Sequence, residues 1–221
     1  MSQRSSDFDE RSEYPLQSSG KVCLLRKAMK VNLNQKACII IDYTKQNVYL
    51  NERPEWDLSL KKVQSLRPNL EKLVQRCELL NIPVIFIGTV EWSEKNLPEN
   101  INQLYKSNPE AAFYSSGEDE QVLKSKGKVI LKNSYSAFSG SQGKLERLLK
   151  RQGINNLIIA GIYSTGCVNA TIVEAFAKGY HLTILKDCIA TFDRKDKQQY
   201  HKILLQDWSR MYGNVVKLAD L

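Results

Sequence analysis

The chain has 221 residues, 42% of them hydrophobic, and its 32 Lys and Arg against 24 Asp and Glu give a formal net charge of +8. This composition fits a soluble globular protein with one full core, and no run approaches the roughly 18 apolar residues that a membrane helix needs. The polar start is unlike a secretory signal, and five cysteines without a CxxC pair favour a reduced, cytoplasmic protein without a disulfide framework.

The positive charge raises the question of an acidic partner such as RNA. The basic residues alternate with acids, as in Arg194-Lys195-Asp196-Lys197, which is typical of ordinary solvated faces. We therefore expect no membrane partner and consider nucleic acid an unlikely one. An anionic substrate or a weak nucleic-acid contact stays open.

The first half of the chain predicts a tail followed by alternating strands and helices. Residues 1–30 are polar and predict a mobile tail or arm, and residues 31–221 predict one domain. The apolar run 37–41 predicts a buried strand, and it ends in Asp42. Helical spacing over 58–80 follows, with Pro68 dividing it into two helices.

The second half continues the alternation. The run 84–87 predicts a strand, and 91–127 predicts a long irregular connection of the kind that usually covers a site. A third strand, 128–131, ends directly before Lys132. The remaining elements are a helix around 145–149, strands at 157–160, 181–185 and 214–217, and helices after Cys167 and over 195–212. This order predicts an α/β fold with a mainly parallel six-stranded sheet flanked by helices.

Cys167 lies where the strand 157–160 turns into a helix that Gly179 ends. Unpaired N–H groups and the positive dipole end at a helix start favour thiolate over thiol. They predict a pKa below the usual value of ~8.5 and could hold an oxyanion. The alternative is a buried cysteine that only packs the helix.

Three side chains should meet at one edge of the sheet, because ligands in parallel sheets bind outside the carboxyl ends of the strands. Asp42, Lys132 and Cys167 each follow a different strand. Lys132 would stabilise the Cys167 thiolate, and Asp42 would take the thiol proton and later deliver it to a leaving nitrogen. Each residue alone has an ordinary structural explanation, but together they predict a catalytic site.

Four motifs resemble the isochorismatase-like cysteine hydrolases. They are the strand ending in Asp42, the K-x-x-x-S-A-F motif from Lys132 to Phe138, the G-x-x-[ST]-x-x-C-V-x-x-T motif from Gly161 to Thr171, and Asp187 with the pair Ala190-Thr191. Their order and spacing agree with the family over about residues 37–216.

The resemblance implies a Rossmann-like three-layer sandwich and a catalytic triad of Asp42, Lys132 and Cys167. It also implies a cis peptide between Ile162 and Tyr163 that aims the Tyr163 N–H at the oxyanion. Family members with this cysteine cleave carbon–nitrogen bonds of small amides and ureides through an acyl-enzyme. Members that hydrolyse the vinyl ether of isochorismate lack it, so the resemblance implies an amidohydrolase.

The pocket and cofactor are less defined. Tyr43, Trp92 and Phe138 are candidates to bind substrate, because each lies near the carboxyl edge. The loop after Asp42 departs from the family's usual D-x-[QT]-x-D-F pattern. His181 and His201 offer no ligand cluster, so we expect no metal and no cofactor and disfavour a nicotinamidase.

Other functions stay open at this stage. A non-catalytic binding or scaffold protein on the same fold is the first alternative, and an isochorismatase-type ether hydrolase is the second. The resemblance also allows a homo-oligomer, a dimer or a tetramer. The substrate itself is not readable from the sequence.

Overall fold

The computed structural model describes residues 35–50, 59–91, 93–108, 121–123 and 125–221. All of them belong to the compact unit Asn32–Leu221. The tail expected over residues 1–30 lies outside the described residues.

The described elements alternate as the sequence predicts. The strands are β1 Lys36–Ile41, β2 Val84–Thr89, β3 Lys128–Lys132, β4 Asn156–Ile162, β5 His181–Ala190 and β6 Asn214–Val216. The α-helices are α1 Lys61–Gln64, α2 Arg67–Leu79, α3 Glu99–Ser107, α4 Lys144–Arg151, α5 Asn169–Ala177 and α6 Lys195–Met211. The short turns are η2 Gln46–Leu50, η5 Ser164–Val168 and η6 Leu218–Asp220.

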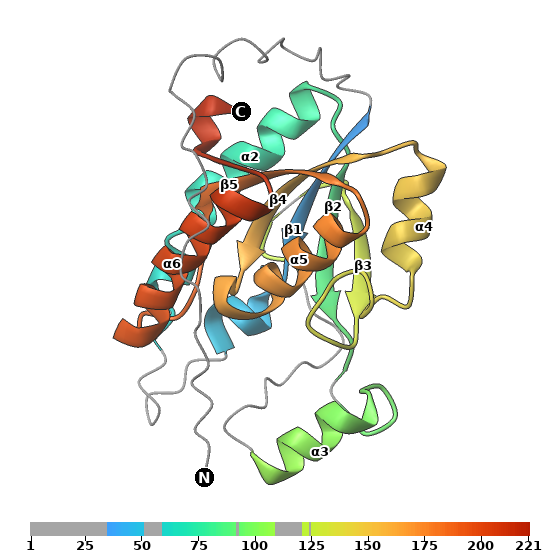
Figure 1. Cartoon of the computed structure of the whole chain (residues 1–221), viewed down its shortest axis with the longest axis vertical. Helices are drawn as coiled ribbons and strands as arrows, with labels where there is room; N and C mark the ends of the chain where they lie inside the picture. The colour runs from blue at the N-terminus through green and yellow to red at the C-terminus, as the bar shows by residue number, and fades with distance from the viewer. Residues whose placement is uncertain (1–34, 51–58, 92, 109–120, 124) are drawn as a thin grey trace, which may run out of the picture. The chain divides into compact units, whose positions relative to one another are not determined.

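The six strands form one sheet in the order β3-β2-β1-β4-β5-β6 (Figure 1). Every neighbouring pair is parallel, which confirms the predicted Rossmann-like α/β fold. The chain moves one way from β1 to β3 and the other way from β4 to β6. The reversal between β1 and β4 opens a crevice at their carboxyl ends, the usual ligand position in such sheets.

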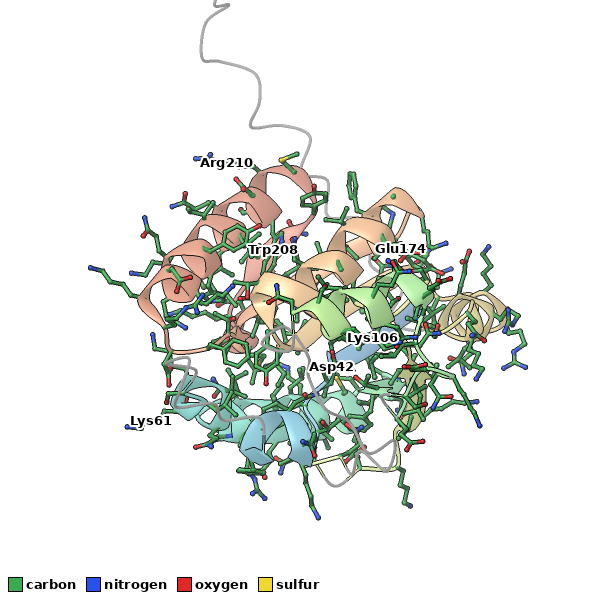
Figure 2. All side chains as sticks on the ribbon, turned by 90° about the horizontal axis from the view of Figure 1, so that it is seen from below. Asp42, Lys61, Lys106, Glu174, Trp208 and Arg210 are labelled. Carbon is green, nitrogen blue, oxygen red and sulfur yellow. The ribbon has the colours of Figure 1, made fainter. Side chains whose placement is uncertain are left out.

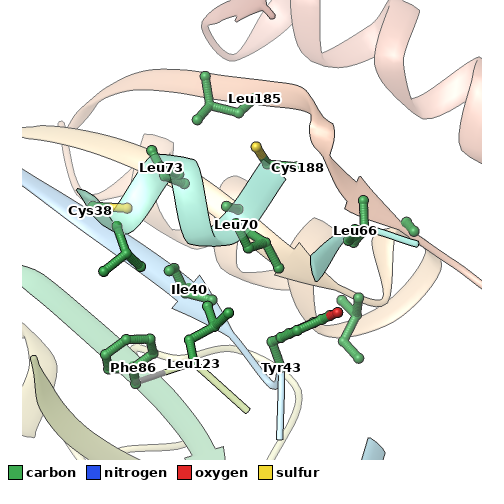
Figure 3. Packing of buried hydrophobic residues seen from close by; sticks show 14 of the residues in the cluster. Cys38, Ile40, Tyr43, Leu66, Leu70, Leu73, Phe86, Leu123, Leu185 and Cys188 are labelled. Carbon is green, nitrogen blue, oxygen red and sulfur yellow. The ribbon is translucent and has the colours of Figure 1, made fainter. Parts of the chain in front are cut away.

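The core has two apolar layers, one on each face of the sheet. The first holds residues of α1, of α2 and of the turn between them, among them Leu66, Leu70 and Leu73, against Cys38 and Ile40 of β1 (Figure 3). The second holds the apolar residues of α4, α5 and α6. The alternate β1 residues face this second layer. A strand buried on both faces reads as the continuous apolar run seen at 37–41.

Two predicted segments differ in detail. The helical pattern of 58–80 divides into α1 and α2 as expected, with Pro68 in the first turn of α2, where a missing N–H costs nothing. The connection 91–127 was predicted to be irregular, but it contains α3. Ile101, Leu104 and Tyr105 of α3 recur at helical spacing, a pattern that the Asn, Pro and Ser residues around it obscured.

Gly161 makes the close approach of β1 and β4 feasible. It has φ +117°, and a Cβ there would collide with the backbone N and O of Ile41, its register partner. Gly161→Ala should lower the free energy of unfolding by about 3 kcal/mol or more. Gly153→Ala is the matched control, because Gly153 has φ +63° and open space around it; its expected loss is about 1 kcal/mol. Urea denaturation that gave equal losses would contradict this account.

None of the helices in the described ranges combines the length and the apolar character needed to cross a membrane.

Candidate active site

The carboxyl edge of the sheet brings together the chain segments that carry the predicted site. Asp42 follows β1, and its N–H donates to the carbonyl of Ile87 in β2 at 2.9 Å. The turn η5 follows β4, which pairs with β1 on the other side. Figure 2 looks onto this edge, with Asp42 near the middle of the view. The site therefore occupies the crevice that the strand order creates.

Lys132 reaches the centre from the edge strand β3. β3 is two strands away from β1, about 10 Å at the usual strand spacing, so only a long side chain can span the gap. Its ammonium lies 3.0 Å from Asp42 Oδ2 and donates to Cys167 Sγ at 3.3 Å and to the Ser134 carbonyl at 3.1 Å. These three contacts match the three protons of the ammonium group and fix its position.

Cys167 is held in the turn η5, which ends where α5 begins. The N–H of Val168 donates to the Tyr163 carbonyl at 3.2 Å, and the Thr171 hydroxyl donates to the Cys167 carbonyl at 2.7 Å. Beneath the turn, the buried Ser164 hydroxyl lies 2.8 Å from His201 Nδ1 of α6. Cys167 itself is only partly buried, so solvent reaches the residue.

The charge state of the thiol differs from the prediction. Burial, followed by the negative charge of Asp42, raises the pKa of Cys167 to about 12, although Lys132 acts in the opposite direction. The expectation of a pKa below ~8.5 is therefore wrong. That expectation included the positive end of the helix dipole, but the sequence does not show how deeply the thiol is buried. Loss of solvent around the sulfur favours the neutral thiol. The resting site holds a neutral thiol beside a lysine–carboxylate pair.

Lys132 remains charged in this setting. Burial alone lowers the pKa of its ammonium, but the opposite charge of Asp42, joined by that of Cys167 once the thiol ionises, outweighs burial and raises that pKa above its usual value. A buried ion pair is stable only when both partners are well placed and hydrogen-bonded. The contacts of Lys132 meet this condition.

Asp42 is presented by an unusual backbone. Its φ is +53°, a conformation that is uncommon for residues other than glycine and clusters at functional sites. Its carbonyl accepts from the N–H of Thr44 at 2.9 Å and from Asn47 Nδ2 at 3.1 Å. One carboxylate oxygen, Oδ1, is buried and has no hydrogen-bond partner among the described residues. That oxygen is in a position to accept a proton.

The peptide between Ile162 and Tyr163 is cis, as the family resemblance implies. The Tyr163 hydroxyl donates to the carbonyl of Asn47 at 2.7 Å, and its ring stacks on Phe192 with centroids 4.2 Å apart. Burial and the charges of Asp42 and Cys167 raise the pKa of this phenol, so it remains a donor. Tyr163 thus ties η5 to the loop after Asp42.

Two of the three aromatics predicted to bind substrate, Tyr43 and Phe138, lie in the core. Tyr43 is fully buried in the core, and its hydroxyl donates to the carbonyl of Val63 at 3.3 Å. Phe138 is buried on the other face, 5.4 Å from the Tyr180 ring. Tyr43 belongs to the first apolar layer and Phe138 to the second. Trp92 lies outside the described residues.

Two tyrosines that the sequence analysis did not single out lie near the nucleophile. Tyr105 of α3 is partly buried, and burial, a hydrogen bond with Tyr135 and the charge of Cys167 raise its pKa. Tyr135 follows Ser134, whose carbonyl accepts from the Lys132 ammonium. The position of Tyr135 inside the K-x-x-x-S-A-F motif could have indicated it, whereas nothing in the sequence marks Tyr105.

The histidines take structural positions. His201 contacts Ser164, as described above, and burial lowers its pKa. His181 opens β5 on the opposite edge of the sheet. Across the described ranges, no group of three or more His, Cys, Asp or Glu side chains is arranged to hold a metal ion.

Comparisons with known proteins agree with this architecture. The family model for the isochorismatase domain matches residues 36–219. Maleamate amidohydrolase from Pseudomonas putida is 31% identical over 121 residues, which cover 54% of this chain and 52% of the relative. N-carbamoylsarcosine amidase from Arthrobacter is 26% identical over 145 residues, covering 62% and 54%. The chain thus spans about half the length of these two curated relatives.

Among solved structures, a cysteine hydrolase from Pseudomonas syringae superposes with a TM-score of 0.70 over 86% of this chain and 92% of its own, at 19% identity. That likeness shows the fold. The match to the family model covers most of the chain and does not depend on the structural likeness. The four sequence motifs agree with that match. The chain belongs to the isochorismatase family.

Proposed function

We propose that this protein is a cysteine-dependent hydrolase that cleaves the carbon–nitrogen bond of a small amide, carbamoyl or ureide substrate through an acyl-enzyme. The observation that carries the proposal is the Lys132 ammonium, which contacts Asp42 Oδ2 at 3.0 Å and Cys167 Sγ at 3.3 Å. Such a nucleophile–cation–carboxylate cluster in a crevice has no evident packing purpose.

The first half of the reaction begins from the neutral thiol. Asp42 accepts the thiol proton as a general base, and its unpartnered Oδ1 supports that role. Lys132 stabilises the thiolate that forms, since its charge lowers the pKa of Cys167. Coupling deprotonation to attack avoids a permanently exposed thiolate.

The sulfur then forms a bond with the substrate carbonyl carbon. As the tetrahedral intermediate collapses, the carbon–nitrogen bond breaks, and protonated Asp42 returns its proton to the leaving nitrogen. A water molecule, deprotonated by Asp42, attacks the thioester, releases the carboxylic or carbamic acid and restores the thiol. Every step uses side chains and water, so the proposed cycle needs no cofactor.

The oxyanion of the intermediate needs hydrogen-bond donors. The backbone N–H groups of Tyr163 and Cys167 remain our prediction for this role, because both belong to the turn segment that carries the nucleophile. The two relatives described above are an amidohydrolase and an amidase, which supports the choice of amide chemistry over ether hydrolysis.

Release of ammonia tests the proposal. We expect the purified full chain to release ammonia from at least one member of a panel of maleamate, N-carbamoylsarcosine and related primary amides and ureides. Failure on the whole panel, together with salt-sensitive binding of RNA or protein, would favour the scaffold alternative. Conversion of isochorismate would favour the ether hydrolase.

The cellular setting also remains a prediction. We propose a cytoplasmic enzyme whose partner is a small-molecule substrate and which forms a dimer or tetramer. Light scattering coupled to size-exclusion chromatography measures the oligomeric state directly, and a monomer at micromolar concentration would contradict that part.

A further inference from the structure

Gln121 is an unsatisfied polar residue beside the active site. Among the described residues, buried side-chain atoms without a hydrogen-bond partner occur only at Asp42 Oδ1 and at both polar atoms of Gln121, Oε1 and Nε2. A carboxamide can accept two hydrogen bonds and donate two. Leaving such a group buried and unpaired is costly, and in native proteins water or a ligand usually supplies the missing partner.

The position of Gln121 connects it to the site. It forms an isolated antiparallel bridge with Thr44, and the neighbouring Val122 N–H faces the carbonyl of Tyr43 at 3.4 Å. Gln121 therefore lies beside the chain that directly follows Asp42. The Thr44 N–H donates to the Asp42 carbonyl at 2.9 Å, so the bridge lies one tight turn from Asp42 and one small molecule can reach both unsatisfied groups.

The chemistry of these groups narrows the ligand class. The charges of Asp42 and Lys132 already neutralise each other across 3.0 Å, and Gln121 is uncharged. A carboxamide presents a donor and an acceptor side by side, and its complement is another group with a donor and an acceptor side by side. A primary amide or a ureide has this pattern, whereas a carboxylate would satisfy only the donor and an ammonium only the acceptor.

We propose that Gln121 is a specificity-determining residue that binds an uncharged carboxamide or ureide group of the substrate through paired hydrogen bonds to Oε1 and Nε2. That the ligand is a substrate rests on the proposed hydrolase function. The binding of a carboxamide or ureide group at Gln121 does not depend on that function. Gln121 contacts the ligand and takes no part in the proton transfers of Asp42.

Two alkylating reagents test this site without a known substrate. Iodoacetamide carries a primary amide, and methyl methanethiosulfonate modifies thiols without one; both depend on the same thiolate fraction. In Gln121→Leu we expect the iodoacetamide rate at Cys167, followed by peptide mass spectrometry, to fall about tenfold relative to the methanethiosulfonate rate. Gln152→Leu, which removes an exposed glutamine beyond α4, should leave both rates unchanged.

Thermal unfolding separates a binding role from a structural one. Replacing an unsatisfied amide by a similar-sized apolar group removes a desolvation penalty, so the melting temperature of ligand-free Gln121→Leu should equal or exceed that of the wild type. Gln121→Glu keeps an acceptor but loses the donors, and should also lose the iodoacetamide preference. An unchanged ratio of the two alkylation rates, or a lower melting temperature with that ratio unchanged, would overturn the proposal.

The outcomes also separate this inference from the proposed function. A lowered ratio in a protein that hydrolyses no amide would support the Gln121 site and reject the hydrolase. Normal amide turnover by Gln121→Leu with an unchanged ratio would retain the hydrolase and reject the role of Gln121.

Discussion

Cys167→Ala is expected to lower kcat on any hydrolysed amide by about 10⁴-fold or more. The substitution removes the atom that forms the covalent intermediate, and losses of a nucleophile in comparable hydrolases are of this size. Fold stability should change little, because Cys167 is only partly buried at the edge of the second apolar layer and the substitution removes a single sulfur atom. Steady-state ammonia release and thermal unfolding measure the two quantities.

Cys77→Ala is the matched control for the loss of a thiol. Cys77 is a fully buried residue of α2 in the first apolar layer, so its replacement should cost about 1 kcal/mol of stability while activity is retained. Full turnover by Cys167→Ala would contradict the nucleophile assignment, whatever Cys77→Ala shows.

Lys132→Met should affect both stability and reactivity. It leaves Asp42, which is 3% exposed, as a buried carboxylate without its cation, and breaking such a pair costs about 3–5 kcal/mol. Loss of the lysine charge also raises the pKa of Cys167 further, since Lys132 is the group that lowers it. At any given pH below 12 the thiolate fraction falls, and iodoacetamide alkylation should slow by about tenfold or more.

The pH dependence of the alkylation rate at Cys167 shows in which direction Lys132 shifts the thiol pKa. In the wild type the alkylation rate should keep rising with pH toward the thiol pKa of about 12 and should not level off near 8.5, the usual value. In Lys132→Met the whole profile should shift to higher pH. Lys128→Met, at the exposed start of the same strand, should match the wild type. Equal profiles for all three proteins would remove the role assigned to Lys132.

The fold and the convergence of Asp42, Lys132 and Cys167 could be predicted because they follow from strong local patterns. Continuous apolar runs such as 37–41 indicate strands buried on both faces, and the carboxyl-edge rule then gathers the residues that follow them. This rule alone predicts the positions of Asp42 and Lys132, because each residue lies at the carboxyl end of a strand whatever the geometry of the loop that follows. The motif around Cys167 supplied the turn.

The remaining parts depend on properties that a sequence does not display. The pKa of Cys167 is set by burial, which requires the packed structure. Tyr43 directly follows Asp42, and Phe138 lies three residues after Tyr135, yet both side chains are buried in the core. The sequence does not show which of two nearby residues points into the crevice. Gln121 is identified only because both polar atoms of its side chain lack hydrogen-bond partners in the folded structure.

The most direct test of the mechanism is the mass of the protein during turnover. The full chain, mixed with a hydrolysed amide and quenched in acid within milliseconds to seconds, should gain the mass of the acyl group, and peptide mapping should place that group on Cys167. The adduct should be absent in Cys167→Ala. Turnover of the amide with no adduct at any quench time, or an adduct on another residue, would contradict the account.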